Sequence, residues 1–304
     1  MGTDAQRIPA FVNPESGTAE GARKALATGP FDVHEVQPDK LKDAIEAAVR
    51  DGAQRILIAG GDGTIRTAVG VVAGTGVELA VLPSGTLNHF AKDHDLPLDL
   101  DEAAKVAAES DAGPVDVGRA GENLFHGTSS IGAYVKFMRH RDRLESKLGY
   151  KIATFVAGIW TFFTMPTIAV EMEVDGKKQI YRTPLVFVAV GERELKIPTL
   201  GGRIKYGKRG LHVMIVRGRR RARLFFLALD AFSRGVDNAS RTPELDAFIV
   251  EWCTISMRRQ HTRISFDGEA QTVDTPLEYE LERDILLLVG GETSRRAGDA
   301  SPRA

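Results

Sequence analysis

Three short turns of glycine and small polar residues carry the chemistry that this sequence offers. They are Asn13-Pro14-Glu15-Ser16-Gly17, Gly60-Gly61-Asp62-Gly63-Thr64 and Pro83-Ser84-Gly85-Thr86-Leu87-Asn88. In the second turn, consecutive glycines allow close backbone approach, so several N–H groups can point at one anion. Thr64 stands where the N-cap of a following helix is expected, and the N-terminus of a helix attracts anions. This pattern predicts a phosphate-binding turn.

Asp62 is a carboxylate in the centre of this predicted phosphate site. A phosphate would repel it unless a divalent cation lay between them, so the pattern predicts Mg²⁺ together with a polyphosphate. The glycine spacing differs from that of a Walker loop and from that of the dinucleotide-binding fingerprint. For this motif alone, a strand-to-helix turn with an aspartate cap stays open as the alternative.

Alternating strands and helices must position these turns. Apolar runs predict strands at 8–12, 32–36, 55–59 and 79–82, and helical periodicity predicts helices at 19–27 and 38–52 and one ending near residue 73. The run 55–59 is typical of a parallel strand buried on both faces. These units predict a doubly wound parallel sheet, in which all three turns follow strands at the carboxyl edge, where such folds bind ligands.

The second part of the chain has a different texture. Segments at 168–174, 185–190, 211–216, 263–266 and 277–281 are typical of mainly antiparallel strands, with helical stretches at 150–163 and 222–233. We therefore expect an α/β domain over residues 1–118, a β-rich domain over 119–283 and a disordered tail over 291–304. A last apolar strand, 285–289, belongs to either domain, so residues 284–290 are candidates to rejoin the first.

The composition excludes several classes of protein. The 304 residues are 43% hydrophobic and 27% charged, which fits a folded protein rather than a disordered, collagen-like or coiled-coil one. The single cysteine, Cys253, excludes an intramolecular disulfide and a cysteine zinc site. Neither a secretory signal nor a run near eighteen apolar residues is evident. We expect a cytoplasmic protein without a transmembrane segment.

Charge is distributed unevenly although the net charge is only −1. Residues 1–118 hold 10 Lys and Arg against 19 Asp and Glu, a net −9, whereas residues 119–283 hold 27 against 19, a net +8. A basic lobe suits phosphate, nucleic acid or an anionic membrane. A basic surface that is merely solvated explains the charge equally well.

Taken in order, the motifs resemble the diacylglycerol kinase catalytic-domain family of lipid kinases, which includes sphingosine kinases. The resemblance rests on NPESG, GGDGT and PSGTLN with a late Asp267-Gly268-Glu269, and it spans residues 13–276. It implies a nucleotide-binding α/β lobe and a β-rich lipid-substrate lobe, and ATP-dependent phosphorylation of a hydroxyl of diacylglycerol or a related lipid, with ATP and Mg²⁺ as cofactors. The residues that it implies in nucleotide binding are Asn13, Pro14, Ser16, Gly17, Gly60, Gly61, Asp62, Gly63, Thr64, Gly85, Thr86 and Asn88.

The resemblance further implies that Asp267 and Glu269 lie near the acceptor hydroxyl. Phosphoryl transfer needs a carboxylate that accepts the proton of the alcohol, a role for which we favour Glu269, with Asp267 orienting it or the metal. A two-residue β-turn, for which Asp-Gly is a common choice, stays open as the alternative. Two other functions also stay open: a nucleotide-binding regulatory protein with weak or no catalysis, and a kinase of the NAD kinase type that acts on a soluble substrate.

Three departures from the family pattern bear on these alternatives. Arg66 stands where an Asn-Glu-Val segment usually begins, and it either reaches a phosphate or faces solvent. His89 replaces a common aspartate and acts either as a polar cap or near phosphate. Lys208 and Arg209 replace an acidic pair that holds a structural Mg²⁺ in members with such a site. Because cationic side chains cannot ligate a cation, we predict that this auxiliary site is absent.

Basic residues beside apolar runs indicate where a lipid kinase would meet a membrane. Residues 217–223 lead into the apolar run 224–229, and five cations between Lys136 and Lys147 precede the predicted helix at 150–163. Each such charge contributes about 1 kcal/mol at an anionic membrane surface, although a basic loop that enters a buried helix gives the same pattern. We expect peripheral membrane association and a lipid partner. Nucleic acid is disfavoured because aromatic residues are not interleaved with the arginines, and the oligomeric state is not predicted.

Overall fold

The computed structural model describes residues 7–132, 143–144, 149, 167–195, 200–216 and 245–291. The chain divides into unit 1, made of residues 1–117, 124–127 and 282–304, and unit 2, made of residues 118–123 and 128–281. It passes between the units four times: within the strands β5 (Ala112–Ala120), β6 (Asn123–Phe125) and β18 (Leu277–Val289), and between residues 127 and 128. The boundaries expected at 118 and 283 lie within two residues of these passages, whereas the sequence did not predict that residues 124–127 belong to unit 1.

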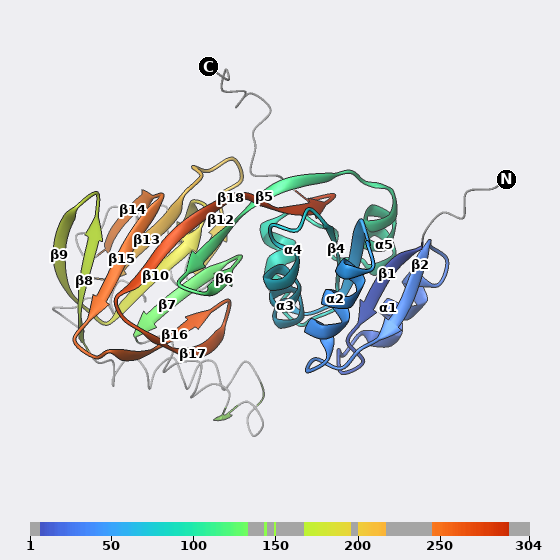
Figure 1. The fold of residues 1–304 in the computed structure, drawn as a ribbon, viewed down its shortest axis with the longest axis horizontal. Coiled ribbons are helices and arrows are strands. Elements are labelled where there is room, and N and C mark those ends of the chain that lie inside the picture. The colour runs from blue at the N-terminus through green and yellow to red at the C-terminus, as the bar shows by residue number, and fades with distance from the viewer. Residues whose placement is uncertain are drawn as a thin grey trace, which may run out of the picture. The chain divides into compact units, whose positions relative to one another are not determined.

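Unit 1 is an α/β fold on a parallel sheet (Figure 1). Its strands lie in the order β2-β1-β3-β4-β18, and each neighbouring pair is parallel. Besides β5 and β18, its elements are β1 (Ile8–Val12), α1 (Ala19–Leu26), β2 (Phe31–Glu35), α2 (Leu41–Arg50), β3 (Arg55–Gly60), α3 (Asp62–Val72), β4 (Glu78–Pro83), α4 (His89–Asp93), α5 (Leu100–Glu109) and β6 (Asn123–Phe125).

Helices cover both faces of this sheet because its central strands are apolar on both sides. In β3, Ile56 and Ile58 pack with residues of α2, α3 and α4, whereas Leu57 and Ala59 pack with residues of α1 and α5. All four side chains are fully buried. In Figure 1, α2 and α3 accordingly lie on one side of the strands, and α1 and α5 lie on the other. The predicted doubly wound sheet is confirmed.

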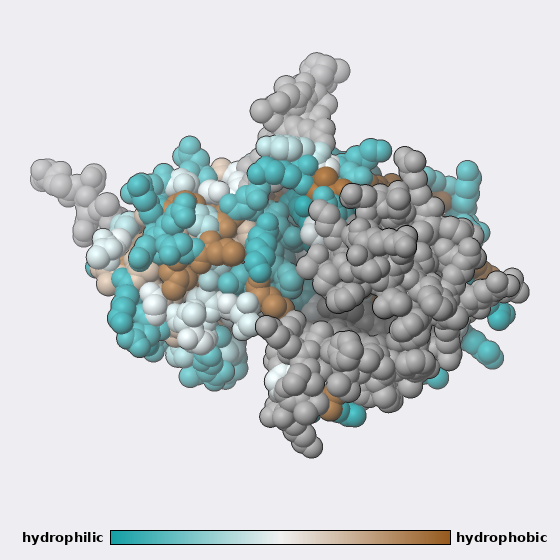
Figure 2. All heavy atoms as spheres, turned by 180° about the vertical axis from the view of Figure 1, so that it is seen from behind, coloured by the Kyte–Doolittle hydropathy of each residue, from teal (hydrophilic) through white to brown (hydrophobic). Residues whose placement is uncertain are grey.

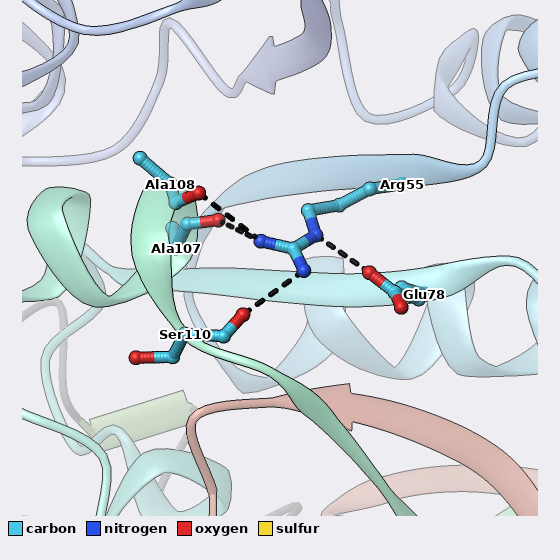
Figure 3. Close-up of polar contacts among 5 residues, drawn as sticks. All are labelled: Arg55, Glu78, Ala107, Ala108 and Ser110. Carbon is cyan, nitrogen blue, oxygen red and sulfur yellow. Dashed lines mark hydrogen bonds and ion pairs between the residues drawn. The ribbon is translucent and has the colours of Figure 1, made fainter.

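A single arginine joins the amino ends of β3 and β4 to the C-terminus of α5 (Figure 3). The Nε–H of Arg55 donates to Oε2 of Glu78 at 2.7 Å, and its two Nη groups donate to the main-chain oxygens of Ala107 at 2.8 Å and Ser110 at 2.9 Å. The last carbonyls of a helix lack partners within the helix, so the guanidinium satisfies them. Helix α5 is thereby held at the end of the sheet opposite the glycine turns.

Unit 2 is built from antiparallel strands. Six of them form a sheet in the order β14-β13-β10-β7-β16-β17. The strands β15, β8 and β9 extend antiparallel from the first part of β18. The elements are β7 (Thr128–Gly132), β8 (Ile168–Val174), β9 (Lys177–Thr183), β10 (Leu185–Val190), β11 (Arg193–Leu195), β12 (Leu200–Arg203), β13 (Leu211–Val216), β14 (Leu245–Val250), β15 (Trp252–Met257), β16 (His261–Phe266) and β17 (Glu269–Asp274). The predicted β-rich lobe is confirmed.

A buried hydrogen bond connects the two strand groups of unit 2. The hydroxyl oxygens of Ser129 on β7 and Tyr279 on β18 lie 2.9 Å apart, and both side chains are buried. Burial raises the pKa of the Tyr279 phenol far above its ordinary value. Burial also raises the pKa of the Cys253 thiol, on β15, to about 12. Both groups therefore stay neutral inside this core near neutral pH.

Two of the predicted features differ in the structure, and several observed elements, among them α5, β9 and β17, were not predicted. Residues 277–281 and 285–289, predicted as separate strands, form the single strand β18; its Asp284 has a positive φ of 56° and donates its N–H to Oδ1 of Asp116 at 3.0 Å. Helix α3 begins at Asp62 because the extended Gly61 serves as its N-cap, so the predicted N-cap role of Thr64 is wrong. The predictions for residues 150–163, 217–233 and the tail from residue 292 concern residues outside the described part of the chain.

Candidate functional site

Three loops follow the carboxyl ends of three adjacent strands in unit 1. They are the NPESG loop after β1, the GGDGT turn after β3 and the PSGT loop after β4. Backbone hydrogen bonds continue from the strands into the loops: Asn13 N–H donates to Ala59 O, and Ser84 N–H donates to Gly60 O, each at 3.1 Å. The prediction that the three turns share one edge of the sheet is therefore confirmed.

The buried Ser84 connects the NPESG loop to the PSGT loop. Its carbonyl oxygen accepts hydrogen bonds from the hydroxyl of Ser16 and, at 2.8 Å, from the hydroxyl of Thr18. Within the NPESG loop, Oδ1 of Asn13 accepts the N–H of Glu15 at 2.9 Å. The side chains of Asn13 and Ser16 therefore hold the conformation of the loops, whereas the sequence had implied only a role in nucleotide binding for them. The residues that the sequence implied in nucleotide binding did not include Thr18 or Ser84, although both are small hydroxyl residues in or beside the motifs.

The GGDGT turn and the PSGT loop approach each other at two glycines. A Cβ atom built on Gly85 would overlap the Cα of Gly61 and would lie 2.9 Å from Oδ1 of Asn88 and 3.3 Å from the nitrogen of Gly61. A Cβ atom on Gly61 would lie 3.3 Å from the Cα of Gly85. Only glycine at position 85 allows this approach without displacement. The two loops therefore present backbone rather than side chains where they meet.

Asp62 is the first residue of α3 and is half-buried. Its Oδ1 accepts the N–H of Phe90 in α4 at 3.0 Å, which fixes the carboxylate between two helices. The first intrahelical bond of α3 runs from Ile65 N–H to Gly61 O, so the N–H groups of residues 62–64 have no acceptor within the helix. Such N–H groups and the positive end of the helix dipole attract anions. The carboxylate and these donors lie together, as a magnesium–phosphate site requires.

Thr64 and Asn88 hold the backbone of their loops. A Cβ atom on Gly60 would lie within 2.7 Å of the Thr64 side chain, so this threonine packs directly over the end of β3. Asn88 has a left-handed conformation, with φ 50° and ψ 48°, which asparagine tolerates better than most residues. Its Oδ1 accepts the N–H of Gly85 at 2.9 Å, and its Nδ2 donates to Pro83 O at 3.3 Å.

The other residues predicted in unit 1 differ in exposure. Gly17, Gly63, Thr86 and His89 are exposed, and Pro14 and Arg66 are half-buried. His89 is the first residue of α4, directly after the N-cap Asn88. Arg66 on α3 is partly buried, so the alternative in which its side chain faces only solvent is not supported.

In unit 2, the predicted acidic motif forms the tight turn between β16 and β17. Asp267 and Gly268 have φ values of 46° and 90°, and Phe266 pairs with Glu269 across the hairpin. Positive φ at both central residues is the type I′ geometry that Asp-Gly favours. Asp267 is also bonded to β7, since its Oδ1 accepts the N–H of Thr128 at 2.9 Å and its own N–H donates to Thr128 O at 2.8 Å. Glu269 begins β17 and is exposed.

Lys208 and Arg209 precede β13, as the sequence indicated. Oε2 of Glu192 accepts the N–H of Lys208 at 2.8 Å, which ties this segment to the loop after β10. The N–H of Arg193 donates to Nδ1 of the buried His212 at 3.0 Å. Burial lowers the pKa of His212, and the Glu192 carboxylate opposes this shift in part. The absence of an auxiliary magnesium site here stays a prediction.

The described residues also bear on hydrophobic surface patches, metal sites and membrane-spanning helices. On the face drawn in Figure 2, the described residues are mainly hydrophilic, with hydrophobic ones in small separate patches. The large hydrophobic side chains that are exposed include Leu98, Ile180 and Trp252. Within the described residues, no three His, Cys, Asp or Glu side chains are grouped to hold a metal ion. Among the helices that the structure describes, none is long and apolar enough to span a bilayer.

Comparison with known proteins shows which families this chain is similar to. Residues 7–120 match the diacylglycerol kinase catalytic domain. The chain is 32% identical over 189 residues to a diacylglycerol kinase of Mycobacterium tuberculosis, covering 57% of this chain and 61% of the relative. It is 25% identical over 198 residues to a diacylglycerol kinase of Staphylococcus carnosus, covering 61% of this chain and 64% of the relative. The chain thus spans about three fifths of the length of these curated relatives.

Solved structures extend the likeness of fold over both units. A crystal structure of a diacylglycerol kinase from Bacillus anthracis superposes with a TM-score of 0.67 and 20% identity, covering 95% of this chain and 98% of that one. At this identity the likeness concerns the fold. Together with the matched segment, it confirms the resemblance that the order of the motifs predicted.

Proposed function

We propose that this chain, whose residues 7–120 match the diacylglycerol kinase catalytic domain, transfers the γ-phosphoryl group of ATP to a hydroxyl of diacylglycerol or a related lipid. One observation carries the proposal: where three loops follow adjacent strands, the N–H groups of residues 62–64 have no acceptor within α3 and lie beside the carboxylate of Asp62. The names of the M. tuberculosis and S. carnosus relatives support the same activity.

The nucleotide side of the reaction follows from the chemistry of the donors. The N–H groups of Asp62, Gly63 and Thr64 would bind phosphate oxygens, and the close approach of Gly61 and Gly85 keeps side chains away from them. Phe90 N–H occupies one oxygen of Asp62, which leaves lone pairs on the carboxylate for a cation. Mg²⁺, when bound, neutralises charge on the phosphates. These residues therefore fit ATP with Mg²⁺.

The acceptor side depends on which carboxylate takes the proton of the lipid hydroxyl. One oxygen of Asp267 already accepts the N–H of Thr128, and this bond fixes the hairpin turn. Glu269 is exposed at the first residue of the next strand, directly after the turn. We assign Glu269 as the general base and Asp267 as the residue that positions it. A lipid acceptor also implies that the protein associates with a membrane surface.

The test is a transfer assay with [γ-³²P]ATP and a panel of diacylglycerol, sphingosine and other lipids in mixed micelles, with NAD⁺ as a soluble acceptor. The proposal expects labelled lipid and no labelled NADP⁺. Glu269→Gln should lower kcat by about 10²- to 10⁴-fold, the usual contribution of a general base. Glu278→Gln, which changes an exposed glutamate elsewhere in unit 2, should keep wild-type kcat.

The alternatives give different results in the same assay. NADP⁺ formation would support a soluble-substrate kinase. Binding of ATP without transfer to any acceptor would support a regulatory protein, and it would contradict the proposed activity.

A further inference from the structure

Two buried serine side chains in unit 2 lie side by side. Ser130 on β7 and Ser265 on β16 are directly opposite each other in an antiparallel pair, which separates their Cβ atoms by about 4.5–5.5 Å. They are 2% and 1% exposed. In the part of the chain that the structure describes, neither Oγ has a hydrogen-bond partner.

Both serines belong to one face of the six-stranded sheet. Successive side chains of a strand point to opposite faces, and Ser129 uses its face to bond Tyr279. Ser130 and, opposite it, Ser265 are therefore on the other face. The row continues through Phe187 on β10, which pairs with Ser130, and Met214 on β13, which pairs with Phe187.

The row changes from apolar to polar along its length. Phe187, Ala189 and Met214 form a buried apolar cluster, and the two serines continue the row towards β17. Ser265 is two residues from Asp267 in the acidic turn. An amphiphile lying along this row would meet apolar side chains at one end and hydroxyls near the acidic turn at the other.

A buried hydroxyl without a partner destabilises a fold, so its presence calls for an explanation. Alanine would fill nearly the same space without that loss. The residues in register beside the pair, Phe187 and Ala270, are uncharged, which disfavours an anionic ligand such as a phosphate. The chemistry instead suits a neutral oxygen that accepts hydrogen bonds.

We infer that Ser130 and Ser265 bind a carbonyl oxygen of the ester linkage of a glycerolipid acceptor, and that the cluster of Phe187, Ala189 and Met214 contacts its acyl chain. This inference rests on the proposed function. It makes the serine pair a determinant of acceptor specificity, because a lipid without ester carbonyls forgoes these hydrogen bonds.

The test measures steady-state kinetics with dioctanoylglycerol and its dialkyl ether analogue for Ser130→Ala, Ser265→Ala and the double variant. Each single variant should raise the KM for dioctanoylglycerol by about 3- to 10-fold, the effect of one lost hydrogen bond. The KM for ATP and the KM for the ether should be unchanged. The melting temperature should be equal or higher, since each change removes an unpartnered buried hydroxyl.

Ser129→Ala is the matched control from the same strand. It removes the buried hydrogen bond between the Ser129 and Tyr279 hydroxyls, so it should lower the melting temperature and leave the KM for dioctanoylglycerol unchanged. An unchanged KM in the Ser130 and Ser265 variants would overturn the inference. So would an equal rise in KM for the ester and the ether.

Failure of the proposed function gives a separate result. If the wild-type protein phosphorylates no lipid, the rise in melting temperature on adding dioctanoylglycerol still tests the serine pair. A rise that is smaller in the double variant than in the wild type supports the inference. Equal rises, or none in the wild type, contradict it.

Discussion

The close approach of Gly61 and Gly85 leads to a prediction about the substitution Gly85→Ala. The new Cβ would overlap the Cα of Gly61 and crowd Oδ1 of Asn88 at 2.9 Å. Carbon atoms in contact prefer separations of about 3.5–4.0 Å, so the GGDGT turn and the PSGT loop must move apart by about 1 Å. This displacement separates backbone donors that we expect to bind the same nucleotide.

The size of the effect follows from that displacement. Inserting a methyl group into packed surroundings costs about 1–3 kcal/mol of unfolding free energy, which lowers the melting temperature by about 2–12 °C at 2–4 °C per kcal/mol. A misplacement of about 1 Å in an active site lowers activity about 100-fold, so kcat/KM for ATP should fall by about that factor.

Gly17→Ala is the matched control. Gly17 belongs to the same group of predicted nucleotide-binding glycines, but a Cβ there meets no atom within 4 Å and its φ is not in the left-handed region. The melting temperature of this variant should equal or slightly exceed that of the wild type, because alanine restricts the unfolded chain. Circular dichroism melts and initial rates of phosphoryl transfer at varied ATP concentration provide the comparison for both variants. A wild-type melting temperature and a wild-type kcat/KM for ATP in Gly85→Ala would refute the reasoning.

Three further predictions concern stability and reactivity. Arg55→Ala should lower the free energy of unfolding by about 2–4 kcal/mol, because it removes the hydrogen bonds to Glu78 and to the α5 carbonyls. Glu78→Gln, which keeps an oxygen acceptor, should lower it by about 1 kcal/mol or less. Equal decreases in urea titrations would show that the α5 carbonyls contribute little. Because burial lowers the pKa of His212, the unfolded chain binds more protons than the folded chain below the ordinary histidine pKa of about 6.5. The free energy of unfolding should therefore fall between pH 7.5 and pH 5.5, and His212→Asn should flatten that decline; an equally steep decline in the variant would exclude His212 as its source. The buried Cys253 should not react with a thiol reagent at pH 8 until urea unfolds the protein, and immediate labelling would contradict the burial that raises its pKa to about 12.

The sequence predicted the elements around the motifs well because their signals are local. Continuous apolar residues in β3 and glycines directly after it specify a buried parallel strand and a turn, and both were found. Strands β10 and β13 were found with the predicted bounds for the same reason.

Strands without an apolar pattern were missed. The edge strand β9, KKQIYRT, is mostly exposed, and β17, EAQTVD, has few apolar residues, so both depend on pairing with a neighbour rather than on burial. The start of α3 was placed too late because an extended glycine, Gly61, serves as the N-cap instead of Thr64.

The sequence predicted which residue types form the candidate site, but not which hydrogen bonds their side chains make. Ser16 and Asn88 belong to the predicted motifs, yet their side chains bond other loop residues, which only the folded chain brings within reach. Ser130 and Ser265 are 135 positions apart in sequence, and their pairing depends on strand register. Single-residue signals in the sequence could not indicate either arrangement.

The most direct measurement is the transfer of ³²P from [γ-³²P]ATP to dioctanoylglycerol by the wild-type protein and by Asp62→Asn. Asparagine keeps an oxygen that can accept the N–H of Phe90, so the fold and its melting temperature should be retained while the charge that attracts a cation is lost. We expect labelled lipid from the wild type and at least about 100-fold less from the variant, as for loss of a group that stabilises transferring phosphate. Equal labelling by both proteins, or none by the wild type, would contradict a magnesium-dependent lipid kinase centred on this aspartate.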